Sequence, residues 1–120
     1  DAPPVLTYLG NIQLLEKTCV AIVGARNASA AGLKTARKLS GGLAERDYCI
    51  VSGMARGIDT IAHQAAIEHG TIAILAGGVD NIYPKENTEL YHRICEEGLI
   101  LAENPVGTKP MTVIFLVVTE

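Results

Sequence analysis

An arginine stands directly after a glycine turn in VAIVGARNAS, residues 20–29. The apolar run before Gly24 is typical of a buried parallel strand, and Ser29 is a good N-cap for a helix that follows. A turn between such a strand and a helix presents unpaired backbone N–H groups and the positive end of the helix dipole, so it attracts anions. Arg26 adds a full positive charge at the same corner. The pattern predicts an anion-binding site at Gly24 and Arg26.

A second glycine turn with an arginine follows the next apolar run, in SGMARGID, residues 52–59. Gly53 and Gly57 let the backbone turn and approach a ligand closely, Ser52 supplies a hydroxyl, and Arg56 supplies charge. Together these residues predict a phosphate-binding loop that leads into a helix.

Asp59 and His63 lie four residues apart on that helix. At this spacing the two side chains are neighbours on one face, where they would form an acid and base couple able to activate water. The alternative is structural: Asp59 caps the helix or orients the loop, and His63 is its hydrogen-bonded partner. We expect the structural role, and the sequence leaves the catalytic one open.

The third glycine motif is AGGVDNIYPKEN, residues 76–87. Gly77 and Gly78 permit another close approach of the backbone to a ligand, and Lys85 adds a charge. Tyr83 either stacks on a nucleic-acid base or only shapes the loop. The motif extends the predicted anion site to a third strand end.

Strands and helices alternate along the chain. Short apolar runs rich in Ile and Val predict buried strands, and helical periodicity predicts three helices between them. The strands are expected at 19–23, 48–52, 71–75 and 99–102. The first helix is expected from Ser29, with Leu33, Ala36, Leu39 and Leu43 on one face, the second to end at Gly70, with Ile58, Ile61, Ala62 and Ala65 on one face, and the third over 87–97. This order predicts an α/β fold, a Rossmann-like three-layer domain with a mainly parallel sheet. Residues 1–18 are interpreted as an irregular lead-in segment and residues 19–120 as the domain.

Positive charges follow each of the four predicted strands, although the net charge of the 120 residues is −3. The carboxyl ends of parallel strands share one edge of the sheet, so these cations are expected to form a positive crevice there. The alternative is that each is a solvated loop cation. The cations are Arg26, Arg56, Lys85 and Lys109, and acids precede the strands at Glu45, Asp47, Glu68, Glu96 and Glu97.

Several classes of protein are not expected. The first turn lacks the dinucleotide fingerprint G-x-G-x-x-G, and no G-x-x-x-x-G-K-[ST] occurs, so neither a nicotinamide enzyme nor a P-loop NTPase is predicted. We expect no cofactor and no metal. The three cysteines lie in apolar stretches without C-x-x-C spacing and no signal or membrane-spanning segment is evident, which predicts a cytoplasmic protein. The chain begins at Asp1, so we interpret it as a piece of a longer protein.

Four motifs together resemble the DNA-processing protein A family, DprA or Smf. They are VAIVGARNAS, VSGMARGIDTIAH, TIAILAGGVDNIYPKEN and EEGLILAENPVGTKP, in this order, and DAPPVLTYLGN resembles the segment before the family's first strand. The resemblance implies a single-stranded DNA binding protein that dimerises and loads the RecA recombinase during natural transformation, and that is not an enzyme. It also implies that Arg26 contacts DNA and that Lys85 and Lys109 lie near further basic contacts.

The end of the chain departs from the family. After Pro110 the family continues with a segment rich in arginine, whereas this chain has MTVIFLVVTE, an apolar stretch suited to a strand. The family's DNA binding, dimerisation and contact with RecA are therefore expected here without the arginines of that segment. The alternative function is a nucleotide-processing enzyme similar to the phosphoribohydrolases, with Ser52, Asp59 and His63 as its catalytic residues. That group's P-G-G-x-G-T-x-x-E stretch is missing, which favours binding.

Overall fold

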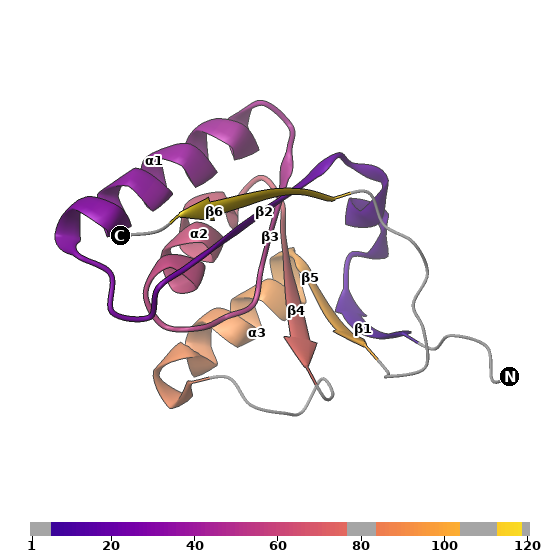
Figure 1. Cartoon of the computed structure of the whole chain (residues 1–120). Helices are drawn as coiled ribbons and strands as arrows, with labels where there is room; N and C mark the ends of the chain where they lie inside the picture. Colours follow the sequence, from indigo (N-terminus) through magenta and orange to yellow (C-terminus); the bar gives the residue numbers. More distant parts are fainter. Residues whose placement is uncertain (1–5, 77–83, 104–112, 119–120) are drawn as a thin grey trace, which may run out of the picture.

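Six strands form one sheet in the order β1-β5-β4-β3-β2-β6 in the computed structural model, which describes residues 6–76, 84–103 and 113–118 (Figure 1). Four of the five strand pairings are parallel, and only β1 with β5 is antiparallel. The elements are β1 (Leu6–Gly10), the 3-10 helix η1 (Ile12–Glu16), β2 (Cys19–Gly24), α1 (Ala30–Glu45), β3 (Cys49–Ser52), α2 (Ile58–Ala66), β4 (Thr71–Ala76), the 3-10 helix η2 (Lys85–Asn87), α3 (Thr88–Glu97), β5 (Leu99–Glu103) and β6 (Val113–Val118). The predicted α/β fold with a mainly parallel sheet is confirmed.

The helices α1, α2 and α3 all pack on the same face of the sheet. Alternate side chains of the strands point to this face, where α1 and α2 cover Val20 and Ile50 and α3 covers Ala73 and Ile100. On the opposite face, Leu14 of η1 packs against the other set of strand residues, Cys19, Cys49, Val51, Ile72 and Leu101. The third layer of the domain therefore consists, in the described residues, of the short η1 segment.

The predicted starts of α1 and α2 and both ends of α3 lie within one residue of the observed ones, but the predicted end of α2 at Gly70 is wrong: the helix ends at Ala66, and residues 67–69 form a turn. The Ser29 side chain caps α1 by accepting a hydrogen bond from the Gly32 backbone, 3.1 Å away.

The apolar face predicted for α1 is not buried at Leu39, which is 38% exposed, whereas Ser40 is fully buried. The residues of α1 that face α2 and the sheet are small, so the helix can approach them closely. Its leucines lie at the edge of this contact and are only partly buried.

The interpretation of residues 1–18 as irregular is wrong over 6–16. β1 pairs with β5 along its whole length, and η1 follows it, capped by the Asn11 side chain. β1 has the short sequence LTYLG at the edge of the sheet, so it lacks the continuous Ile and Val run that identifies a strand buried on both faces. The strand-like character of the tail, in contrast, is confirmed by β6, which pairs with β2.

Candidate functional site

Three of the four predicted cations lie at the same edge of the sheet. Arg26 follows β2, Arg56 follows β3, and Lys85 begins η2 after β4, and all three residues are exposed. Because β2, β3 and β4 are parallel neighbours, their carboxyl ends meet at this edge. Lys109, Gly77 and Gly78 lie outside the described residues.

Arg26 stands where the strand order reverses. From β2 the chain runs outward through β3 and β4 to β5, and then returns to pair β6 with the other side of β2. Ligands of open α/β sheets bind at the carboxyl ends beside such a reversal. Within the described residues Arg26 has no ion pair, either with Asp59 or with another carboxylate.

Arg56 is engaged by a neighbouring loop. Its Nε lies 2.6 Å from the Oε2 of Glu86, and both side chains are more than half exposed, at 62% and 56%. The pKa of Glu86 lies below its usual value, because its own backbone N–H and then the Arg56 guanidinium favour the charged form. Sequence reasoning treated Arg56 as a free cation and missed this partner. A signal was present, because Glu86 directly follows Lys85, which was expected at the same edge of the sheet as Arg56.

Asp59 orients the loops after β2 and β3, as the structural interpretation predicted. Its Oδ1 accepts a hydrogen bond from the Gly24 backbone at 3.4 Å, and its Oδ2 accepts one from the Gly53 backbone at 3.0 Å. The side chain is buried, with 5% exposed. The two glycine N–H groups that were expected to face a phosphate therefore donate to this carboxylate.

Ser52 and Gly57 both take part in the scaffold of the loops after β2 and β3. The Ser52 hydroxyl is buried and donates to the carbonyl of Ile22 at 2.6 Å, which joins β3 to β2. Gly57 has a φ of 79°, and a Cβ there would lie 2.6 Å from the carbonyl oxygen of Ala25 and 2.7 Å from that of Arg26. Gly57 therefore permits close contact between the two loops.

His63 does not pair with Asp59, so this part of the expectation is wrong. Its Nδ1 lies 2.7 Å from the Oγ1 of Thr71, and the ring is fully buried. Burial lowers the pKa of His63 to about 3 from its usual 6.5, against an opposing effect of the Ser52 backbone. A neutral, enclosed ring with its contact directed at β4 is not placed to act with Asp59 on a substrate.

Asn87 is a residue that sequence reasoning missed. Its Nδ2 donates to the carbonyl of Met54 at 3.1 Å and to the Oγ1 of Thr60 at 2.8 Å. Met54 has a positive φ of 66°, and its side chain is fully buried. Asn87 thus fixes the loop after β3 to the start of α3. The sequence indicated this role only by placing a polar residue directly before a predicted helix.

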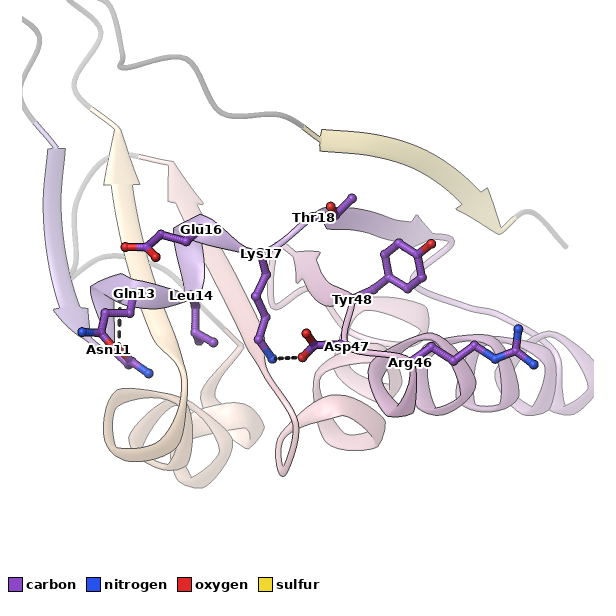
Figure 2. A pocket seen from close by; sticks show the side chains of 9 residues that line it. All are labelled: Asn11, Gln13, Leu14, Glu16, Lys17, Thr18, Arg46, Asp47 and Tyr48. Carbon is purple, nitrogen blue, oxygen red and sulfur yellow. Dashed lines mark hydrogen bonds and ion pairs between the residues drawn. The ribbon is translucent and has the colours of Figure 1, made fainter.

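The described residues also form a hollow of about 620 Å³ at the opposite edge of the sheet (Figure 2). It lies between η1, the start of β2 and the end of α1, and Lys17 crosses it to contact Asp47 at 2.9 Å. Lys17 Nζ also donates to the His69 carbonyl at 3.0 Å, so this cation is already satisfied. No group of three or more metal-ligating side chains occurs in the part of the chain that the structure describes, and no helix there is long and apolar enough to cross a membrane.

The chain is similar to proteins of known name along most of its length. The family model of DNA recombination-mediator protein A matches residues 1–117. The DNA processing protein DprA of Streptococcus pneumoniae is 45% identical over 113 residues, which cover 92% of this chain and 40% of that protein. Protein Smf of Synechocystis is 45% identical over 114 residues, which cover 90% of this chain and 29% of that protein.

Solved structures agree with this similarity. The structure of Streptococcus pneumoniae DprA has a TM-score of 0.75 and 42% identity, and covers 88% of this chain and 38% of that one. DNA processing protein A from Helicobacter pylori, described for its unique single-stranded DNA binding mode, has a TM-score of 0.77 and 34% identity, and covers 88% of this chain and 49% of that one. The chain thus spans less than half the length of these relatives.

Proposed function

We propose, from the premise that the chain belongs to the DNA recombination-mediator protein A family, that it binds single-stranded DNA at the carboxyl edge of its sheet. The observation that carries the proposal is the pair of exposed cations Arg26 and Lys85, neither of which has an ion pair within the described residues. They follow strands separated only by β3, on a scaffold that Asp59 and Asn87 hold in place. Exposed, unpaired cations of this kind are suited to the phosphates of a strand.

The proposed contacts are electrostatic and independent of base sequence. Arg26 holds one phosphate and Lys85 another, with Lys109 as a further candidate contact. Arg56 contributes less to binding in this proposal, because its ion pair with Glu86 neutralises its charge. The scaffold of the site consists of Gly24, Ser52, Gly53 and Gly57, whereas Gly77 and Gly78 allow close approach of the DNA backbone.

Binding without catalysis is the proposed mode of action. Asp59 and His63, the residues of the enzyme alternative, are both buried and have separate hydrogen-bond partners. We propose further that the protein acts in the cytoplasm during DNA uptake and natural transformation, as a dimer that loads RecA. The names of its relatives, as DNA processing and recombination-mediator proteins, support the DNA-related part of this proposal.

The experiment is a titration with labelled single-stranded DNA, duplex DNA and mononucleotides at several salt concentrations. For a single strand, the logarithm of affinity falls with the logarithm of salt by about 0.7 per phosphate neutralised. Arg26→Ala is expected to weaken binding similarly for all sequences and to make this slope shallower by about 0.7. Arg46→Ala is the matched control, because Arg46 is also exposed but lies at the opposite edge of the sheet.

Three results would contradict the proposal. The first is a chain that binds no single-stranded DNA at low salt. The second is a slope that stays unchanged in Arg26→Ala or falls equally in Arg46→Ala. The third is hydrolysis of a nucleoside monophosphate that disappears in His63→Ala, which would favour the enzyme.

A further inference from the structure

The carboxylate of Asp59 lies where a ligand anion would be expected. In α/β proteins, N–H groups of the turns beyond the strands hold phosphates. Here the turns after β2 and β3 each direct one such group to the same side chain, Gly24 at 3.4 Å from Oδ1 and Gly53 at 3.0 Å from Oδ2. The carboxylate therefore bridges two neighbouring strand ends as a bound oxyanion would.

The position is built to hold this negative charge. Asp59 lies in the first turn of α2, where the helix dipole favours an anion, and only 5% of the residue is exposed. A Cβ on Gly53 would lie 3.2 Å from Oδ2, so the carboxylate fills the space against the glycine backbone. Asp59 forms no ion pair with any cation in the described ranges, so backbone groups hold its charge.

We propose that Asp59 is a specificity-determining residue, whose carboxylate occupies the Gly24 and Gly53 N–H groups and excludes phosphate from the two glycine turns. A phosphate at this point would lose two donors to the carboxylate and would also be repelled by its charge. A mononucleotide has one phosphate, so its affinity depends on several hydrogen-bond donors that meet at one point, such as the N–H groups of the two glycine turns. A DNA strand instead spreads its phosphates over separate exposed cations such as Arg26 and Lys85. Asp59 thus selects the polymer over the free nucleotide, an inference that rests on the proposed function.

The test compares the unchanged chain with Asp59→Ala and Asp59→Asn. Asp59→Ala frees both N–H groups, so we expect it to bind inorganic phosphate and thymidine monophosphate roughly tenfold more tightly or better. Asp59→Asn keeps one acceptor oxygen and is expected to gain less. Binding of an oligothymidylate is measured alongside; because Asp59 also orients the loops after β2 and β3, this binding is not expected to stay constant, but it should not rise as the affinity for phosphate does. Glu45→Ala is the control, because it removes an equal charge at the other edge of the sheet.

Two outcomes would overturn the inference. One is a folded Asp59→Ala variant whose affinity for inorganic phosphate equals that of the unchanged chain. The other outcome needs no variant, so it can be measured even if both variants fail to fold. When phosphate is added to the unchanged 15N-labelled chain, the inference predicts that the Gly24 and Gly53 amide resonances stay in place. Movement of both with rising phosphate concentration would show that these groups are accessible. If the unchanged chain binds no oligothymidylate, the proposed function fails, while the phosphate comparison still reports on Asp59.

Discussion

The Nδ1 of His63 on α2 lies 2.7 Å from the Oγ1 of Thr71 at the start of β4, and both residues are fully buried. The same hydroxyl donates to the carbonyl of Ile50 at 2.9 Å. A hydroxyl has a single proton, so both contacts are hydrogen bonds only if Nδ1 donates to Thr71. His63 is therefore a neutral ring with its proton on Nδ1, and its Nε2 has no hydrogen-bond partner within the described residues.

The buried His63 predicts a loss of stability in mild acid. Its pKa is lowered to about 3 in the folded chain but is near 6.5 when unfolded, so below pH 6.5 the unfolded state binds a proton that the folded state excludes. The free energy of unfolding should fall by about 1.4 kcal/mol by pH 5.5 and about 2 kcal/mol by pH 5. Urea unfolding at pH 8 to 5 measures this. In His63→Gln the decline should largely vanish, and an identical decline in both chains would refute the assignment.

Thr71→Val tests the hydrogen bond itself. The valine has nearly the shape of threonine but leaves the Nδ1–H of His63 without its acceptor and the Ile50 carbonyl without the hydroxyl donor, so we expect a loss of about 1–3 kcal/mol in the free energy of unfolding. Thr35→Val, at an exposed position of α1, is the matched control and should change stability by less than about 0.5 kcal/mol. Equal effects of the two substitutions would show that the buried contact contributes little.

The strands and helices were largely predictable because their signals are local. Continuous Ile and Val runs mark the central strands, and Ser29 and Gly98 stand at the helix ends where the structure has them. A cation that follows a parallel strand could be placed at the carboxyl edge from topology alone. For this reason the common edge of Arg26, Arg56 and Lys85 is confirmed.

Side-chain partners were not predictable, because they depend on which strands lie next to each other and in what register. His63 was expected to contact Asp59, four residues away, but its partner Thr71 becomes a neighbour only when β4 pairs beside β3. The Asp59 contact to Gly24 joins residues 35 apart, and the Asn87 contact to Met54 joins residues 33 apart. No periodicity in a single sequence encodes such separations.

Gly57→Ala is predicted to disturb the site through the backbone. Gly57 has a φ of 79°, and its new Cβ would lie 2.6 Å from the carbonyl oxygen of Ala25. Left-handed strain and this clash together should lower the free energy of unfolding by about 2 kcal/mol or more. Gly42→Ala is the control, because nothing lies within 4 Å of its Cβ position in α1, and it should be neutral or stabilising by up to about 1 kcal/mol. Thermal melting of both variants gives the comparison, and equal stability would contradict the close approach of the loops.

Glu86→Gln is predicted to strengthen DNA binding. Glu86 holds the Arg56 guanidinium at 2.6 Å on the edge that carries Arg26 and Lys85, so it neutralises one cation of the proposed surface. Removing its charge frees Arg56 to contact a phosphate and removes a repulsion from the strand. Affinity for an oligothymidylate should rise several-fold at low salt, and the salt slope should steepen by about 0.7, the share of one further phosphate.

Two further variants isolate the role of Arg56 in that gain. Glu97→Gln makes the same charge change and breaks a similar exposed pair, Arg93 with Glu97 at 2.9 Å, but at the end of α3 that precedes β5. It should therefore leave the salt slope as it is, since the amino edge of the sheet is distant from the proposed surface. Adding Arg56→Ala to Glu86→Gln should return the slope to that of the unchanged chain, because the freed guanidinium is then absent. A steeper slope that persists without Arg56 would mean that Glu86 acts by general repulsion, and the specific contact would be wrong.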